Sequence, residues 1–385
     1  MTETLTGQEL AALVRRVFRP GPGDRILAII VDLPDGKVPD TVAWARRRAL
    51  ALDWYRALLP EAPGLGLEVR LYLYRNAHGN NADLPATAWR YDDGPLPGAA
   101  EDWADRAAEA FAELWEGGTI LLAPTQFSAT APLKIAAREH PFRAATMPGF
   151  SEIMIPALRL DYGEINRRCQ HMKGLLDVAV AAELEFLLDG VETHRLHLDL
   201  RHRTATASGG SFPDNGVAGN LPSGETYIVP YEGEVAGDPT GSAGTLPVQF
   251  GEEVVVYTIT ANVATAARGE GPAGADEARR LAEEPAYGNI AELGLGVLAD
   301  YGLAPTGEIL LDEKLGLHVA FGRSDHFGGQ VGAAQFSSPD RVVHIDRVYI
   351  PSLQPRIRVV RVDLTNPDGA VVPLMRDGAY IIEWA

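Results

Sequence analysis

Between Arg25 and Asp32 the residues are Ile-Leu-Ala-Ile-Ile-Val, a nearly continuous apolar run. Such a run without polar alternation predicts a strand buried on both faces, which is typical of a parallel sheet covered by helices. Further strands are predicted at 67–74 and 119–123, and helices at about 42–59 and 101–114. Because strands and helices alternate, we expect an α/β N-terminal domain with a mainly parallel sheet.

The pattern changes in the second half of the chain. A long helix is predicted over Asp161–Leu188, and beyond Gly190 the segment His194–Leu200 alternates polar and apolar residues, as in a half-buried strand. The other strands are predicted at 226–229, 254–261, 317–321, 342–346, 357–363 and 380–384, with one helix at 276–284. A chain of 385 residues exceeds one ordinary core. We therefore expect a scaffold domain at 1–190 and a mainly antiparallel β (α+β) metal-binding domain at 191–385.

The composition restricts the partners. The net charge of −18 argues against nucleic acid and anionic membranes, since both attract basic surfaces. The single cysteine, Cys169, excludes an intrachain disulfide and fits a reducing compartment. The first residues lack a signal-peptide pattern, and no apolar stretch approaches the ~20 residues that span a bilayer. We expect a cytoplasmic protein.

The first domain has no recognisable nucleotide motif. Neither Gly-x-Gly-x-x-Gly nor a Walker lysine motif follows its predicted strands. The segment Thr125–Lys134 is rich in hydroxyl residues and directly follows a strand, where open α/β sheets bind ligands. Helix capping by Ser128 or Thr130 is the alternative interpretation.

Four short segments of the second half carry side chains that bind metals. They contain Glu225, Glu292, Glu313 with His318 five residues later, and the pair His344 and Asp346. Carboxylates together with imidazoles are ligands for Zn, Co, Mn or Fe. The i, i+2 spacing of the last pair places both side chains on one face of a strand. The sequence therefore predicts a carboxylate-rich metal site, most simply for two ions.

Glycine and proline accompany these segments. Pro222 and Gly224 predict a tight turn before Glu225, and Gly294 and Gly296 allow the backbone to be approached closely.

Each segment also has a structural interpretation. A glutamate after a turn is commonly solvated, and a His-x-Asp pair is often only hydrogen-bonded. The chain has a second such pair, His197 and Asp199. We expect His194, His197 and His202 to be surface or cross-strand residues rather than ligands.

Together the segments resemble the aminopeptidase T family of metallopeptidases, also called thermophilic or PepS-type aminopeptidases. The segments that carry the resemblance are NLPSGETYIVP (220–230), NIAELGLG (289–296), LDEKLGLHVAFG (311–322) and HID (344–346). The match is specific over roughly 190–350. The resemblance implies metal ligands at Glu225, Glu292, Glu313, His318, His344 and Asp346, with Glu313 as ligand or general base. It further implies two divalent ions (Zn, Co, Mn or Mg), a homodimer, and hydrolysis of N-terminal residues from small peptide or aminoacyl substrates.

The chain departs from that family at one position. The family carries a tyrosine seven residues after the equivalent of His318, whereas this chain has Asp325 followed by His326. A carboxylate donates no hydrogen bond to an oxyanion unless it is protonated, so a protonated His326 is the catalytic candidate there. The alternative is a loop without a role. Arg323 and Asp325 are candidates for substrate binding; Arg323 and Lys314 can orient a substrate carboxylate, or form surface salt bridges.

Two other functions stay open. Iron-dependent ring-cleaving dioxygenases, typified by 2,5-dihydroxypyridine dioxygenase, resemble the same fold and use a mononuclear Fe(II) site of two histidines and one carboxylate. The presence of Glu225 and Glu292 favours the dinuclear hydrolase instead. A binding or biosynthetic relative without peptidase activity is the third possibility, which the missing tyrosine supports.

Overall fold

The structure is a computed structural model that describes residues 3–116, 118–338 and 341–384. The chain forms two compact units: residues 1–166 with 210–223, and residues 167–209 with 224–385. The division therefore runs through helix α6 (Tyr162–Val178) rather than at Gly190. Whether 1–190 and 191–385 act as separate domains stays a prediction.

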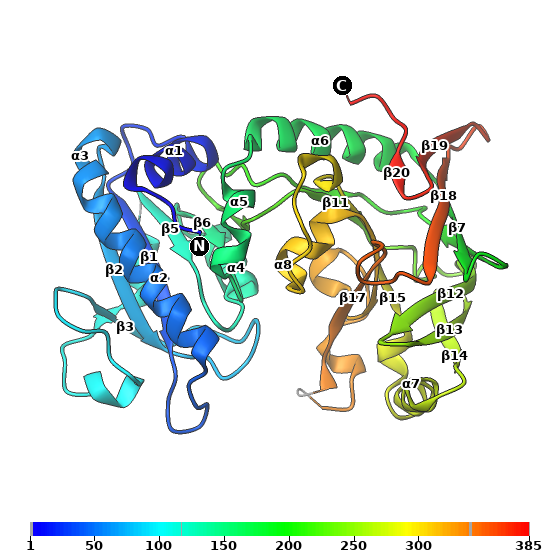
Figure 1. Ribbon diagram of the computed structural model, residues 1–385, viewed down its shortest axis with the longest axis horizontal. Helices are drawn as coiled ribbons and strands as arrows, with labels where there is room; N and C mark the ends of the chain where they lie inside the picture. Colours follow the sequence, from blue (N-terminus) through cyan, green and yellow to red (C-terminus); the bar gives the residue numbers. More distant parts are fainter. Residues whose placement is uncertain (1–2, 117, 339–340, 385) are drawn as a thin grey trace. The chain divides into compact units, whose positions relative to one another are not determined.

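The first unit is built on a mixed, mainly parallel sheet (Figure 1). Its strand order is β10-β6-β5-β1-β2-β3-β4, and the pairs from β10 to β2 are all parallel. The strands are β1 (Ile26–Leu33), β2 (Glu68–Arg75), β3 (Thr87–Arg90), β4 (Glu109–Ala110), β5 (Thr119–Ala123), β6 (Arg143–Thr146) and β10 (Val217–Asn220). The helices include α1 (Gly7–Phe18), α2 (Val42–Leu58), α3 (Ala62–Leu65), α4 (Thr130–Glu139) and α5 (Ile155–Leu158). The predicted fold class of this half is confirmed.

The apolar run is central to that sheet. Strand β1 pairs with β2 on one side and β5 on the other, and every residue from Leu27 to Leu33 is buried. The hydroxyl-rich segment after β5 forms internal hydrogen bonds: the Ser128 hydroxyl donates to Asn81 Oδ1, and the Thr130 hydroxyl lies 3.0 Å from Asn220 Oδ1. The Ser128 hydroxyl also accepts from Thr130 N, at the first residue of α4, at 3.3 Å, so these contacts give the segment a structural role.

The helix predicted at 101–114 is wrong. This segment forms two 3-10 turns, η2 (Ala100–Trp103) and η3 (Phe111–Trp115), with the short strand β4 between them. Trp103 stacks on Tyr91, Phe111 packs edge-on against Tyr74, and β4 pairs with β3. Aromatic packing and strand pairing here outweigh a local helical preference.

The helix predicted at 161–188 is also wrong in its second half. Helix α6 ends at Val178, and β7 (Ala181–Leu188) follows. Leu184, Phe186 and Leu188 are buried and alternate with the partly buried Glu183, Glu185 and Leu187, which is the period of a strand. Pairing with neighbours on both sides therefore decides the structure of this segment.

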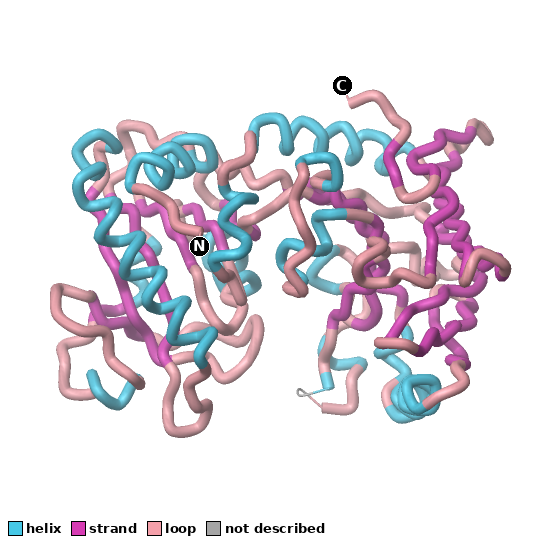
Figure 2. Tube along the Cα trace, in the orientation of Figure 1, coloured by secondary structure: helices cyan, strands magenta, loops and turns pink. Residues whose placement is uncertain are grey.

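The second unit consists mainly of two antiparallel sheets, visible as magenta strands in Figure 2. The first has the order β17-β16-β15-β11-β9, and the second β14-β13-β12-β8-β7-β18-β19-β20. Their remaining strands are β8 (Glu192–Asp199), β9 (Thr206–Ser208), β11 (Glu225–Ile228), β12 (Ala243–Phe250), β13 (Glu253–Thr260), β14 (Val263–Arg268), β15 (Ile290–Gly296), β16 (Leu317–Gly322), β17 (His344–Val348), β18 (Ile357–Thr365), β19 (Val371–Arg376) and β20 (Ala379–Tyr380). Helices α7 (Pro272–Glu283) and α8 (Ile309–Asp312) complete the unit. The predicted antiparallel class is confirmed. The predictions do not include β9, β12, β14, β15 and β19, and the strand predicted at 380–384 is limited to β20.

One face of the five-stranded sheet is apolar. Leu293 and Leu295 of β15 and Leu317 and Val319 of β16 join the same buried core as residues of the eight-stranded sheet. The residues between them point to the opposite face. Among the described residues, no helix is both long and apolar enough to cross a bilayer.

Candidate metal centre

The predicted ligands lie on the polar face of the five-stranded sheet. In the register of the strands, Asp346 is opposite Ala320, which is in turn opposite Glu292. His318 is opposite Gly294 on the neighbouring strand. Side chains from β11, β15, β16 and β17 therefore converge, although more than a hundred residues separate the first from the last.

Glycines make the convergence possible. A Cβ atom at Gly294 would lie 1.8 Å from His318 Nε2, so the imidazole rests directly over the backbone of β15. A Cβ atom at Gly296 would lie 2.4 Å from the carbonyl oxygen of Glu313, where the turn η7 (Glu313–Leu315) packs on the same strand. The predicted close approach at both glycines is confirmed.

The turn before β11 fixes Glu225. Gly224 has a φ of 143°, which side chains other than hydrogen rarely tolerate, and its carbonyl oxygen accepts a hydrogen bond from Val297 N at 2.8 Å. A Cβ atom there would also meet the Leu298 side chain at 2.7 Å. Glu225 therefore emerges at a defined place beside β15.

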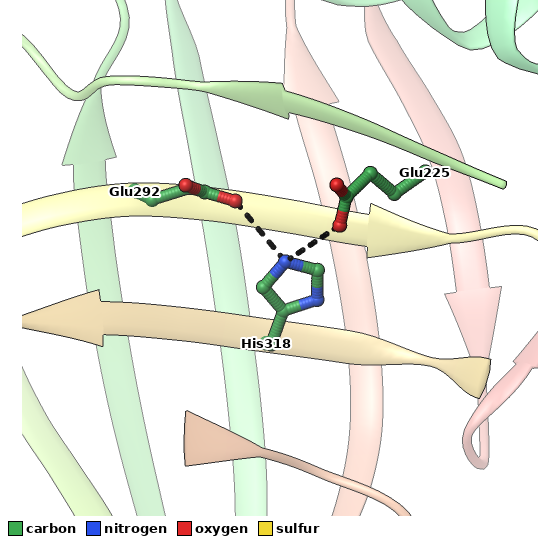
Figure 3. Close-up of side chains that lie close together, drawn as sticks. All are labelled: Glu225, Glu292 and His318. Atoms are coloured by element: carbon green, nitrogen blue, oxygen red, sulfur yellow. Dashed lines mark hydrogen bonds and ion pairs between the residues drawn. The ribbon is translucent and has the colours of Figure 1, made fainter. Parts of the chain in front are cut away.

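The first ligand group consists of Glu225, Glu292 and His318, all of them buried (Figure 3). His318 Nε2 lies 3.1 Å from Glu292 Oε1 and 3.5 Å from Glu225 Oε2. Its Nδ1 faces the carbonyl oxygen of Gly316 at 3.3 Å, and a carbonyl oxygen only accepts, so Nδ1 carries a hydrogen. Nε2 is then the nitrogen available to a metal ion.

The second ligand group consists of Glu292, His344 and Asp346. His344 Nε2 lies 3.3 Å from Glu292 Oε2 and 3.5 Å from Asp346 Oδ1. Its Nδ1 donates to the carbonyl oxygen of Arg323 at 2.8 Å, which again directs Nε2 toward the carboxylates.

Glu292 belongs to both groups. Its Oε1 faces one histidine and its Oε2 faces the other. Because Nδ1 of each imidazole already donates to a carbonyl oxygen, Nε2 can face a carboxylate oxygen favourably only if it binds an additional proton or a metal ion. The donor set of three carboxylates and two imidazoles therefore fits divalent Zn, Co, Mn or Fe.

In both ligand groups, the neighbouring charges and burial shift the pKa values in opposite directions. Burial lowers the pKa of His318, but Glu292 and Glu225 outweigh it and raise this pKa to about 9. Burial likewise lowers the pKa of His344, yet Asp346 and Glu292 raise it well above its ordinary value. Burial raises the pKa of Glu292, but the two histidines hold it well below its usual range. The cluster strongly favours positive charge beside its carboxylates.

Glu313 and Lys314 pair with each other beside Glu225, and the role of Glu313 as metal ligand or general base stays a prediction. Among the described residues Glu313 belongs to neither ligand group. Lys314 has no exposed side-chain surface and donates to Glu313 Oε1 and, at 2.7 Å, to Glu225 Oε1. The interpretation of Lys314 as a surface salt bridge is therefore wrong. Burial, opposed by Lys314, raises the pKa of Glu313 to about 8.

The segment that departs from the family lies next to the second group. The ring centroid of His326 is 5.5 Å from that of His344, and burial lowers the pKa of His326 to about 4. His326 is therefore neutral at neutral pH and donates only through the N–H of its tautomer. Arg323 Nε donates to Asp325 Oδ1 at 2.6 Å, so these two substrate-binding candidates pair with each other. Their binding role stays a prediction.

Sequence reasoning missed Tyr227. It lies two residues after Glu225 on β11, so both side chains share a face of the strand. Its ring packs on Phe327 with centroids 4.7 Å apart. Burial, followed by the charges of Glu292 and Glu225, raises the pKa of Tyr227, so the phenol remains a hydrogen-bond donor. The i, i+2 spacing from Glu225 is the sequence feature that indicates a place for Tyr227 beside the ligands.

The second His-x-Asp pair has ordinary partners. His197 Nδ1 lies 2.5 Å from Glu183 Oε1 on the neighbouring strand, and His202 Nε2 lies 2.9 Å from Asp238 Oδ2. His194 Nδ1 lies 3.1 Å from the hydroxyl of Thr245. Within the described chain, neither potential metal-binding group includes any of these histidines.

Comparisons with known proteins identify the fold. No family model and no curated protein matches the sequence. Among solved structures, 2,5-dihydroxypyridine dioxygenase from Pseudomonas putida KT2440 matches with a TM-score of 0.61 and 14% identity, over 98% of this chain and 99% of that one. Wild-type AmpT from Thermus thermophilus matches with a TM-score of 0.56 and 16% identity, over 98% of both chains. The chain therefore has the fold of aminopeptidase T, which the dioxygenase shares.

We predict that the two His-x-Asp pairs differ in metal binding. His344→Ala removes a ligand of the second group and should lower the metal content by about one ion per chain. His197→Ala, on a comparable strand, should leave the content unchanged. Plasma mass spectrometry after loading and desalting measures both. Equal metal content in the two variants would contradict the placement of the site.

We also predict that metal binding displaces protons. His318, with its pKa of about 9, is protonated at neutral pH without metal, and a ligand must be neutral. The apparent affinity of the first ligand group should therefore rise with pH up to about 9 and then level off. In the metal-free protein the same shift contributes stability that is complete below about pH 6.5 and lost as pH rises through about 9. Calorimetry in buffers of different ionisation enthalpy measures the released protons; pH-independent affinity would refute the expectation.

Proposed function

We propose that the protein is a metal-dependent aminopeptidase that removes N-terminal residues from small peptides or aminoacyl compounds. The observation that carries this proposal is the position of Glu292, whose two oxygens each face a different histidine. Each side also has a further carboxylate, Glu225 or Asp346. This arrangement suits two divalent ions joined by one carboxylate, as in two-metal hydrolytic sites.

The chemistry follows from the donor set and its neighbours. Bound divalent ions would polarise a carbonyl group and lower the pKa of a bound water. Glu313 is the candidate general base: its carboxylate form, which predominates above its pKa of about 8, would take a proton from that water and pass it to the leaving amine. Lys314 keeps this carboxyl group in place. The phenol of Tyr227 and the N–H of His326 are donors for the oxygen on which charge develops.

The ring-cleaving dioxygenase is the alternative. A mononuclear Fe(II) site would use two histidines and one carboxylate and leave neighbouring positions open. Here the carboxylate of Glu292 lies within 3.3 Å of both imidazoles, which favours a shared ligand over open positions. A relative without peptidase activity is disfavoured by the same complete donor set. We further propose a cytoplasmic homodimer, on the basis of composition and resemblance alone.

The proposal predicts hydrolysis that depends on a free N-terminus. Metal-free protein is reconstituted separately with Zn, Co, Mn and Mg and assayed with a panel of aminoacyl anilides and dipeptides. N-acetylated versions of the same substrates should be inert, because a free amine is needed to anchor the substrate. Glu292→Gln should lose both metal and activity.

Two results would contradict the proposal. Turnover by Glu292→Gln at the wild-type rate would remove Glu292 from the centre. Oxygen uptake with an iron-loaded protein and a dihydroxylated aromatic compound, without hydrolysis of any free-amine substrate, would establish the dioxygenase instead.

A further inference from the structure

Lys314 places its side-chain amino group inside the candidate metal centre. Its side chain is completely buried, and its ammonium donates to one oxygen of Glu225 and one of Glu313. A buried ammonium is costly unless it is paired and hydrogen-bonded, and here two carboxylates provide that pairing. The ammonium thus makes contacts that a metal ion in a carboxylate-rich site would make.

The backbone of Lys314 is held against β15. Its carbonyl oxygen accepts from Leu298 N at 2.9 Å, and Gly296 N donates to the carbonyl oxygen of Gly316, also at 2.9 Å. A Cβ atom at Gly296 would lie 2.3 Å from the carbonyl carbon of Lys314. These backbone contacts hold the turn in place, so the ammonium has a defined position in the site.

The ammonium acts on the two ligand groups unequally. It contacts Glu225 Oε1, whereas Glu225 Oε2 lies toward His318 in the first group. Glu225 is therefore divided between the ammonium and the first group. The contacts of Lys314 are to Glu225 and Glu313, and neither of these belongs to the second group.

We propose that Lys314 is an internal cation that competes with the metal ion of the first group for Glu225. It also keeps Glu313 from binding that ion. Two cations that share one carboxylate repel each other, and the repulsion is weakly screened in a buried site. The second group then holds the tightly bound ion, and the first group holds a weaker, exchangeable one. This inference rests on the proposed two-ion centre and adds to it which of the two ions binds more tightly.

Lys314→Met tests the inference, because methionine is of similar length and carries no charge. Stepwise Zn²⁺ and Mn²⁺ titrations by calorimetry should give two dissociation constants that differ at least tenfold in the wild type. In Lys314→Met the weaker constant should tighten at least tenfold. Lys173→Met is the matched control, since Lys173 pairs with Asp177 on α6, and it should titrate like the wild type.

A second measurement separates the effect of the Lys314 charge on metal binding from any effect of the substitution on folding. Metal-free Lys314→Met should melt below the wild type, because two carboxylates lose their partner, yet its Tm should rise more on metal addition. Lys314→Arg retains the charge and should retain the weak second constant. Lys314→Gln removes the charge with a smaller polar side chain and is interpreted like Lys314→Met if the latter does not fold.

The outcomes distinguish this inference from the proposed function. A second ion bound equally well or more weakly in both neutral variants would overturn the competition. Two equal dissociation constants in the wild type would overturn it as well. The absence of metal binding in every variant, the wild type included, would instead refute the metalloenzyme itself.

Discussion

The carboxylate of Glu292 lies between two imidazoles on the buried polar face of a five-stranded sheet, and much of the second unit is arranged to allow this. Gly294 leaves room for His318, Gly296 leaves room for the turn that carries Glu313, and the left-handed Gly224 directs Glu225 to the same place. The opposite face of these strands is apolar and packs into the core. The rigidity of that core positions the donor atoms.

Much of this arrangement could be predicted from the sequence. The run in β1 indicated a buried parallel strand, and the i, i+2 spacing of His344 and Asp346 indicated a shared strand face. Turn residues before Glu225 and glycines after Glu292 indicated where the backbone is approached closely. These features depend on local chemistry that a sequence records directly.

Other features depend on contacts between distant segments. The sequence predicts helix where β7 lies, because the pairing of β7 with β8 and β18 is not visible in its own composition. The surface interpretation of Lys314 is wrong because the fold brings Glu225 Oε1 within 2.7 Å of its ammonium, a contact between distant segments that the sequence does not record. Tyr227 was overlooked for the same reason: its proximity to the ligand groups follows from the register of β11 against β15. Strand β15 itself was missed, because its two glycines weaken a strand pattern.

The most direct test of the central claim is the anomalous diffraction of a crystal loaded with Zn or Mn. The account predicts two peaks about 3.5–4 Å apart, one on each side of the Glu292 carboxylate. Each peak should lie about 2.0–2.2 Å from a different oxygen of Glu292. A single peak bound by His318, His344 and Asp346 without Glu292 would contradict the shared carboxylate and the hydrolase derived from it.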